Sequence, residues 1–267
     1  MSVDPYATSS SSAGYRSIRL RADDDILFLQ IHRPAANNAI DDGLIAEMTR
    51  ALREWDGRAK VVVLEGLSEV FCSGADFGEI QARFDSGTPG GQDPGPLYDL
   101  WYALASGAFL SVAHVRGRAN AGGVGFVAAC DIVLAEEKAS FSLSELLFGL
   151  MPACVMPFLI RRMGFSKANF MTLMTQPIPA RQAMEWGLVD AVEDNSENLL
   201  RKQLLRLRRI GGPGIARYKR YAAELDDSLR AAREKALRAN LDVFSDPDNL
   251  RRIARYVKTG KFPWEAD

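Results

Sequence analysis

Short apolar runs bounded by polar turns occur in the first half of the chain, and they predict β-strands. Residues 17–21 and 26–31 are separated by a turn of three aspartates, a pattern typical of a β-hairpin. Residues 61–64 form an unbroken Val-Val-Val-Leu run, which favours a strand that is covered on both faces. Residues 109–115 and 132–135 predict further strands.

Apolar residues at helical spacing predict helices between and after these strands. The first helix lies between Ile40 and Trp55 and has aspartates in its first turn, where they complement the helix dipole. Residues 117–125 predict a Gly-rich connection that leads into a helix of small residues. Glycines and prolines then separate successive helices over residues 152–163, 166–175 and 180–186.

The order of these elements divides the chain into three parts. Residues 1–15 are Ser-rich and lack the basic and apolar regions of a signal peptide, so they predict a disordered leader. Residues 16–195 predict a core of ββα units, and residues 196–267 a helical C-terminal region. Within the core, the Gly- and Pro-rich residues 86–95 predict a mobile surface loop near the site or a plain surface insertion.

Composition and charge exclude several classes of protein. The 267 residues are 47% hydrophobic and 25% charged, which is typical of a globular protein with a sizeable core. The formal net charge of −1 gives no global field that would attract nucleic acid or an anionic membrane. Three scattered cysteines without CxxC spacing argue against a disulfide framework and a zinc site, and indicate a reducing compartment. We therefore expect a cytoplasmic protein with no nucleic-acid or membrane partner.

Two Gly-containing turns follow predicted strands, at residues 71–76 and 120–125. Both could present bare backbone N–H groups, and two such turns facing one another would form an oxyanion hole. The alternative for either turn is a glycine that allows a helix to pack closely on a strand. The spacing matches neither a dinucleotide-binding fingerprint nor a P-loop, and there is no GxSxG motif. His32 and His114 lie in or beside apolar strands, which favours structural roles for both.

Glu145 is a carboxylate flanked by apolar residues in the segment 141–149. Burial in such surroundings raises the pKa of a carboxyl group toward the range that is useful for proton transfer. The alternative is that Ser144 and Glu145 cap a helix.

Taken together, five segments in register resemble the enoyl-CoA hydratase/isomerase, or crotonase, superfamily. They are residues 33–39, 71–76, 121–132, 141–149 and 183–189. The resemblance spans about residues 16–195 and implies an α/β fold, a crotonase-type spiral of ββα units with a helical C-terminal trimerisation region. It also implies an acyl thioester substrate, carried on coenzyme A or on the phosphopantetheine of a carrier protein, and no metal or redox cofactor.

Further segments look like the polyketide-biosynthesis dehydratases of β-branching cassettes. They are residues 96–101, 114–117, 140–154, 244–247 and 262–265. This resemblance implies a lyase that dehydrates 3-hydroxy-3-methylglutaryl thioester on an acyl carrier protein to 3-methylglutaconyl thioester. It also implies a homotrimer or a dimer of trimers. The alternatives on the same scaffold are a Δ3,Δ2-enoyl-CoA isomerase, a methylglutaconyl decarboxylase, and an inactive scaffold that docks carrier proteins.

The resemblance assigns roles to individual residues. The oxyanion donors match the backbone N–H groups of Ala75 and Gly122, and the second of the two hydratase glutamates matches Glu145. The first glutamate falls on Gly125, so the simplest scheme has Glu145 act as base and then as acid. Asn120 is an alternative donor, or it braces the Gly-rich turn.

A basic segment suggests where a carrier protein could bind. Residues 201–220 contain eight lysines and arginines and no acidic residue. An acidic carrier protein or a phosphate would be attracted to such a patch, with Arg206, Arg208 and Arg209 as candidates. The alternative is a solvated helix face or a set of salt bridges between subunits.

Overall fold

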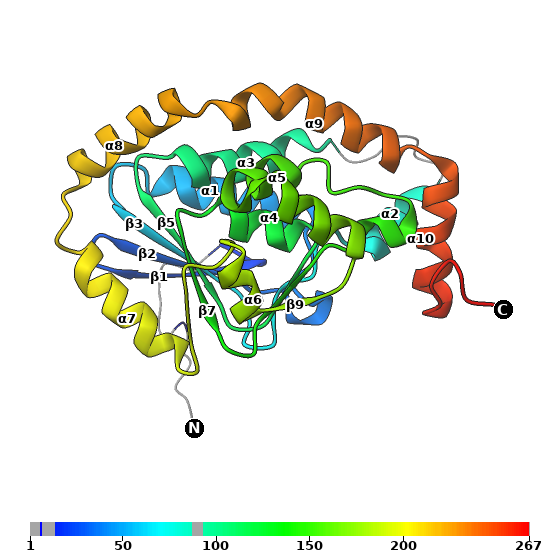
Figure 1. The fold of residues 1–267 in the computed structure, drawn as a ribbon, viewed down its shortest axis with the longest axis horizontal. Coiled ribbons are helices and arrows are strands. Elements are labelled where there is room, and N and C mark those ends of the chain that lie inside the picture. Colours follow the sequence, from blue (N-terminus) through cyan, green and yellow to red (C-terminus); the bar gives the residue numbers. More distant parts are fainter. Residues whose placement is uncertain (1–5, 7–13, 87–92, 267) are drawn as a thin grey trace.

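The computed structural model describes residue 6, residues 14–86 and residues 93–266. In this part of the chain the strands form two sheets (Figure 1). The larger sheet has the strand order β1-β2-β3-β5-β7-β10, with the bounds β1 (Ile18–Asp23), β2 (Ile26–Ile31), β3 (Val61–Glu65), β5 (Leu110–Val115), β7 (Ile132–Glu136) and β10 (Ala191–Glu193). The smaller sheet has the order β4-β6-β8-β9, with the bounds β4 (Val70–Cys72), β6 (Arg118–Asn120), β8 (Ser140–Ser142) and β9 (Ile178–Pro179).

The strands β2, β3, β5, β7 and β10 pair in parallel, each with the next one in the sheet. At β2 and β3 both faces of the sheet are buried, as is typical of parallel sheets. Val62 and Leu64 of β3 point into the main core. Val61 and Val63 point the other way, into a second core with leucines of α7 (Ser196–Leu207). The alternation of side chains along a strand thus explains why an unbroken apolar run is needed here.

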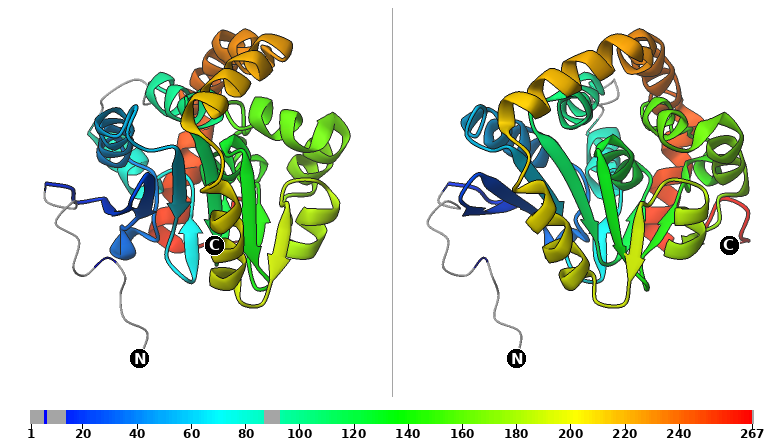
Figure 2. Two further views of the ribbon diagram at one scale, coloured as in Figure 1. Left: turned by 90° about the vertical axis from the view of Figure 1, so that its left-hand side faces the viewer. Right: turned by 60° about the vertical axis from the view of Figure 1, so that its left-hand side comes forward.

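The remaining helices surround the main core and extend from it (Figures 1 and 2). In both figures α8 and α9 form an arch along one side of the molecule, and α10 stands at its end. The bounds are α1 (Asp42–Glu54), α2 (Phe77–Asp85), α3 (Gly95–Ser106), α4 (Gly122–Ala129), α5 (Met156–Met174), α6 (Ala180–Glu185), α8 (Gly212–Leu225), α9 (Ser228–Phe244) and α10 (Pro247–Thr259), with the short 3-10 helices η2 (Pro34–Ala36) and η3 (Glu145–Phe148). Among the described residues, none of these helices is long and apolar enough to cross a bilayer.

Most predicted elements are confirmed. β1 and β2 pair as an antiparallel hairpin, and the Asp41 side chain caps α1 by accepting from the Leu44 N–H at 2.7 Å. Two of the predicted helices are joined in α5, which bends at Gly164, where φ is 76°. The predicted connection at residues 117–125 was wrong in part, because it contains β6. A strand of three residues has too few positions to show an alternating pattern.

Parts of the leader and loop predictions lie outside the described residues, namely residues 1–5, 7–13 and 87–92. Within the leader, Tyr6 is described; its side chain is buried and its hydroxyl donates to Glu65.

The close packing of α4 on β4 gives a testable prediction. A Cβ atom at Gly123 would lie 2.4 Å from the Cys72 carbonyl oxygen, so Gly123→Ala should lower the free energy of unfolding by about 1–3 kcal/mol. Gly214 in α8 has nothing within 4 Å of such an atom, and Gly214→Ala should stabilise the protein by up to about 1 kcal/mol. Urea denaturation of both variants measures the difference, and effects of the same sign would contradict this account of the α4 packing.

Candidate active site

A cavity of ≈ 970 Å³ lies beside the smaller sheet, and residues of α2, α3, α9 and α10 form other parts of its wall. It brings together four of the residues that the sequence singled out: Ala75, Asn120, Gly122 and Glu145 all line it. They come from separate segments, namely the turn after β4, the end of β6, the start of α4 and the start of η3.

The two Gly-containing turns touch one another at the cavity. A Cβ atom at Gly74 would lie 2.7 Å from Ala121 Cβ and 3.4 Å from the Gly122 nitrogen. Gly74 also has a φ of 91°, in the left-handed region that favours glycine. The contact therefore requires glycine at position 74, and it brings the amides of Ala75 and Gly122 to neighbouring turns.

Neither of these amides has a hydrogen-bond acceptor among the described residues. Ala75 forms an isolated β-bridge with Ile40, but the hydrogen bonds of this bridge use the residues on either side of Ala75. The Ile40 N–H donates to the Gly74 carbonyl at 2.8 Å, and the Asp76 N–H donates to the Ile40 carbonyl at 3.2 Å. Gly122 is the first residue of α4, where an N–H has no partner within the helix. The two N–H groups are therefore available to an acceptor in the cavity, and the dipole of α4 favours negative charge there.

Glu145 supplies a carboxyl group to the same cavity. Burial raises its pKa to about 7, against the opposing effect of hydrogen bonds from the backbone of Glu145 and Ser144. Its Oε2 atom is buried and has no hydrogen-bond partner in the described part of the chain. Such a group can take up and release a proton near neutral pH.

Residues of α10 hold the segment that carries Glu145. The Phe148 ring lies 5.1 Å from the rings of both Phe77 and Tyr256, in edge-on contacts. Asn249 donates to the Gly149 carbonyl at 3.0 Å, where φ of Gly149 is 80°. The C-terminal helices therefore help to bury Glu145.

Asn120 braces the loops that carry the other site residues. Its Nδ2 donates to the Ser73 carbonyl at 3.3 Å and to Ser144 Oγ at 3.0 Å, and its Oδ1 accepts from Ser142 Oγ at 2.8 Å. These bonds favour the bracing alternative over a direct role as proton donor. Ser144 is the N-cap residue of η3 but makes no side-chain cap hydrogen bond, so the structure does not support its part in the helix-cap alternative.

Trp101 occupies the space next to Gly125, where the resemblance places the first hydratase glutamate. A Cβ atom at Gly125 would lie 2.5 Å from Trp101 Cζ2, so a glutamate does not fit there in this packing. The indole Nε1 is buried without a partner among the described residues, and Trp101 lines the cavity. Sequence analysis missed this residue, because an apolar residue at helical spacing is typical of a core position.

The arginines of the basic segment lie elsewhere. Figure 1 shows the end of α7 at the opposite end of the molecule from α2 and α10. Arg206 lies in the last turn of α7, and Arg208 forms an ion pair with Asp23. The structure thus does not bring Arg206, Arg208 or Arg209 to the cavity of the same chain.

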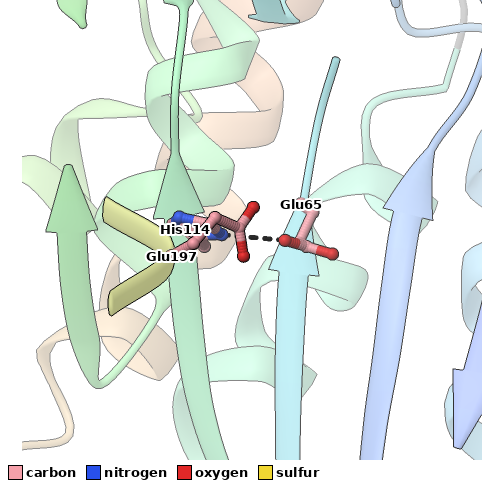
Figure 3. Close-up of side chains that lie close together, drawn as sticks. All are labelled: Glu65, His114 and Glu197. Atoms are coloured by element: carbon pink, nitrogen blue, oxygen red, sulfur yellow. Dashed lines mark hydrogen bonds and ion pairs between the residues drawn. The ribbon is translucent and has the colours of Figure 1, made fainter. Parts of the chain in front are cut away.

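A second cluster of titratable groups consists of Glu65, His114 and Glu197 (Figure 3). None of these three residues lines the cavity. His114 Nδ1 is 2.8 Å from Glu65 Oε1, and Nε2 is 2.9 Å from Ser196 Oγ. Both ring nitrogens of His114 are therefore hydrogen-bonded. The hydrogen bonds among Glu65, His114 and Ser196 form a buried polar network that ties β3 and β5 to α7, and Glu197 is exposed at its edge.

The chain is similar in sequence and in structure to known proteins. The chain is 53% identical to bacillaene synthase dehydratase PksH of Bacillus subtilis, over 94% of this chain and 97% of the relative. The crystal structure of PksH superposes with a TM-score of 0.92, covering 93% of this chain and all of that one. A 2,3-dehydroadipyl-CoA hydratase of Escherichia coli is 32% identical to this chain, and the match covers 81% of this chain and 82% of the length of the hydratase.

The fold is accordingly the mixed α/β crotonase fold that the resemblance implied, with helices at its C-terminal end. Residues 21–267 match the family described as enoyl-CoA hydratase/isomerase. The chain belongs to the enoyl-CoA hydratase/isomerase family.

Proposed function

We propose that this protein is a dehydratase that removes water from 3-hydroxy-3-methylglutaryl thioester to give 3-methylglutaconyl thioester in polyketide biosynthesis. The observation that carries the proposal is one cavity with two unpaired backbone amides and one buried carboxyl group whose pKa is raised to about 7. The 53% identity to a relative named as a polyketide-pathway dehydratase supports it.

In the proposed reaction, the amides of Ala75 and Gly122 bind the thioester oxygen as it gains negative charge. The Glu145 carboxylate removes a proton from C2, and the electrons of that C–H bond pass toward the carbonyl. The enolate then forms the C2–C3 double bond as the C3–O bond breaks. Glu145 returns its proton to the departing hydroxyl group, which leaves as water.

A single carboxyl group performs both proton transfers in this scheme. Gly125 leaves no second carboxylate at the position beside Trp101. In the simplest scheme, therefore, Glu145 acts as both base and acid on one face of the substrate. Atoms and electrons balance without an oxidant or reductant, so the scheme needs no redox cofactor.

The substrate is proposed to arrive on an acyl carrier protein, and the protein to assemble as a trimer or a dimer of trimers. Exposed apolar side chains on α5 support an assembly: Phe165 is 64% exposed and Leu173 63%. If the basic segment at Arg206, Arg208 and Arg209 binds a carrier protein, the carrier's arm must extend from there to a cavity that these arginines do not line.

The reaction is tested by incubating the protein with 3-hydroxy-3-methylglutaryl carrier protein and measuring the mass of the acyl group. We expect the loss of one water. Loss of carbon dioxide would instead indicate the decarboxylase, and an unchanged mass the isomerase or the inactive scaffold.

Glu145→Gln should lower kcat by about 10²- to 10⁴-fold, because the amide can neither accept nor return the proton. In the wild type, kcat/KM should rise with pH through about 7, as the carboxyl group loses its proton. Steady-state kinetics across pH measures both effects. Glu224→Gln, on the exposed surface of α8, is the matched control. Turnover of Glu145→Gln within a few-fold of wild type would rule out the assignment.

The same substitution should stabilise the fold in a pH-dependent way. The pKa of Glu145 is raised from 4.5 to about 7, so the folded state holds a proton that the unfolded chain releases. This group's contribution to stability is therefore lost as pH rises from 4.5 to 7. Glu145→Gln should gain about 3 kcal/mol near pH 8 and almost nothing near pH 4. Urea denaturation at both pH values measures this gain, and a gain that did not change with pH would contradict the burial argument.

A further inference from the structure

We propose that Arg118 binds a second carboxylate of the substrate, so that the site selects thioesters of dicarboxylic acids. The inference rests on the proposed function for the position of the thioester. It comes from Arg118, which lines the cavity and begins β6, the strand that leads into the turn with Gly122.

The pairing of strands places Arg118 on the cavity face. Along β6, Arg118 and Asn120 point to one side, and the buried Ala119 points to the other. Arg118 pairs with Val70 of β4 on one flank and with Ser140 of β8 on the other. All of these residues except Ala119 line the cavity. Val70, Arg118 and Ser140 therefore form a row across the three strands, with the cation of Arg118 in the middle and the hydroxyl group of Ser140 beside it.

Charge distinguishes Arg118 from the other basic residue of the wall. Among the described residues that line the cavity, the cations are Arg83 and Arg118. Arg83 is paired with Asp42 at 2.7 Å and with Glu79 at 2.6 Å, so its charge is already balanced. The Arg118 guanidinium has no ion-pair or hydrogen-bond partner in the described part of the chain. It is available to an anion that enters the cavity.

The spacing suits the proposed substrate. Arg118 and Asn120 lie about 7 Å apart along the strand, and Gly122 follows two residues later. In the substrate, the second carboxyl carbon is four single bonds from the thioester carbonyl, about 5 Å away when extended. An arginine side chain spans the remaining distance while the thioester oxygen stays at the Gly122 amide.

The chemistry of the group favours a carboxylate. A guanidinium donates two parallel N–H bonds to the two oxygens of one carboxylate, which gives both strength and orientation. The Ser140 hydroxyl on the neighbouring strand can donate a further bond. A substrate held at both ends presents C2 to Glu145 in a single orientation.

The test compares two thioesters that differ in this carboxylate alone, 3-hydroxy-3-methylglutaryl and 3-hydroxy-3-methylbutyryl pantetheine. Arg118→Gln should lower kcat/KM for the first on the order of 10- to 100-fold and leave the second within about 3-fold. Arg118→Lys should restore part of the loss. Arg53→Gln, an exposed arginine at the end of α1, is the matched control and should change neither. Equal losses for both substrates, or no loss for either, would overturn the inference.

A binding experiment separates this inference from the proposed reaction. In the Glu145→Gln background, calorimetry should show tighter binding of the 3-hydroxy-3-methylglutaryl thioester, and Arg118→Gln should abolish that preference. If the wild type dehydrates neither thioester but this preference is found, the reaction is wrong and the carboxylate site stands. If wild-type dehydration occurs but the preference is missing, the reaction stands and the carboxylate site is wrong.

Discussion

The close contact between the turn after β4 and the start of α4 is the constraint on which the site depends. β4 and β6 run in parallel, so their carboxyl ends meet at one edge of the smaller sheet. Gly74 lets the turns touch, because any Cβ there would collide with Ala121. The contact brings together two backbone amides that have no acceptor among the described residues. A fixed pair of donors stabilises developing charge without having to reorganise, which is the main source of catalytic power in many enzymes.

The polar groups around this contact are hydrogen-bonded to one another, whereas polar atoms that face the cavity lack partners. Asn120 ties Ser73 to Ser144 and uses both its amide nitrogen and its oxygen. By contrast, Glu145 Oε2 and Trp101 Nε1 are buried without partners in the described part of the chain. Unpaired buried polar atoms are costly, and they are common where a ligand is to supply the partner. Asn120 and its partners thus hold the loops in place, while Glu145 Oε2 and Trp101 Nε1 are left without a partner among the described residues.

The C-terminal helices contribute directly to the environment of Glu145. α10 packs against Phe148 and Gly149, and Phe244 and Tyr256 form part of the cavity wall. This packing removes water from around the carboxyl group and raises its pKa. The C-terminal helices therefore contribute to the burial of the group that is proposed to do the chemistry.

The sequence by itself determined the main elements, the family and four of the residues that line the cavity. β3 and α1 could be predicted because a β-branched run and a 3.6-residue period are local properties of the chain. The short strand β6 could not be, since three residues carry no period and pairing with β4 and β8 defines it. The tertiary structure alone decided that Trp101 fills the space at Gly125 and that Arg118 faces the cavity. Both depend on contacts between distant segments, which no local pattern encodes.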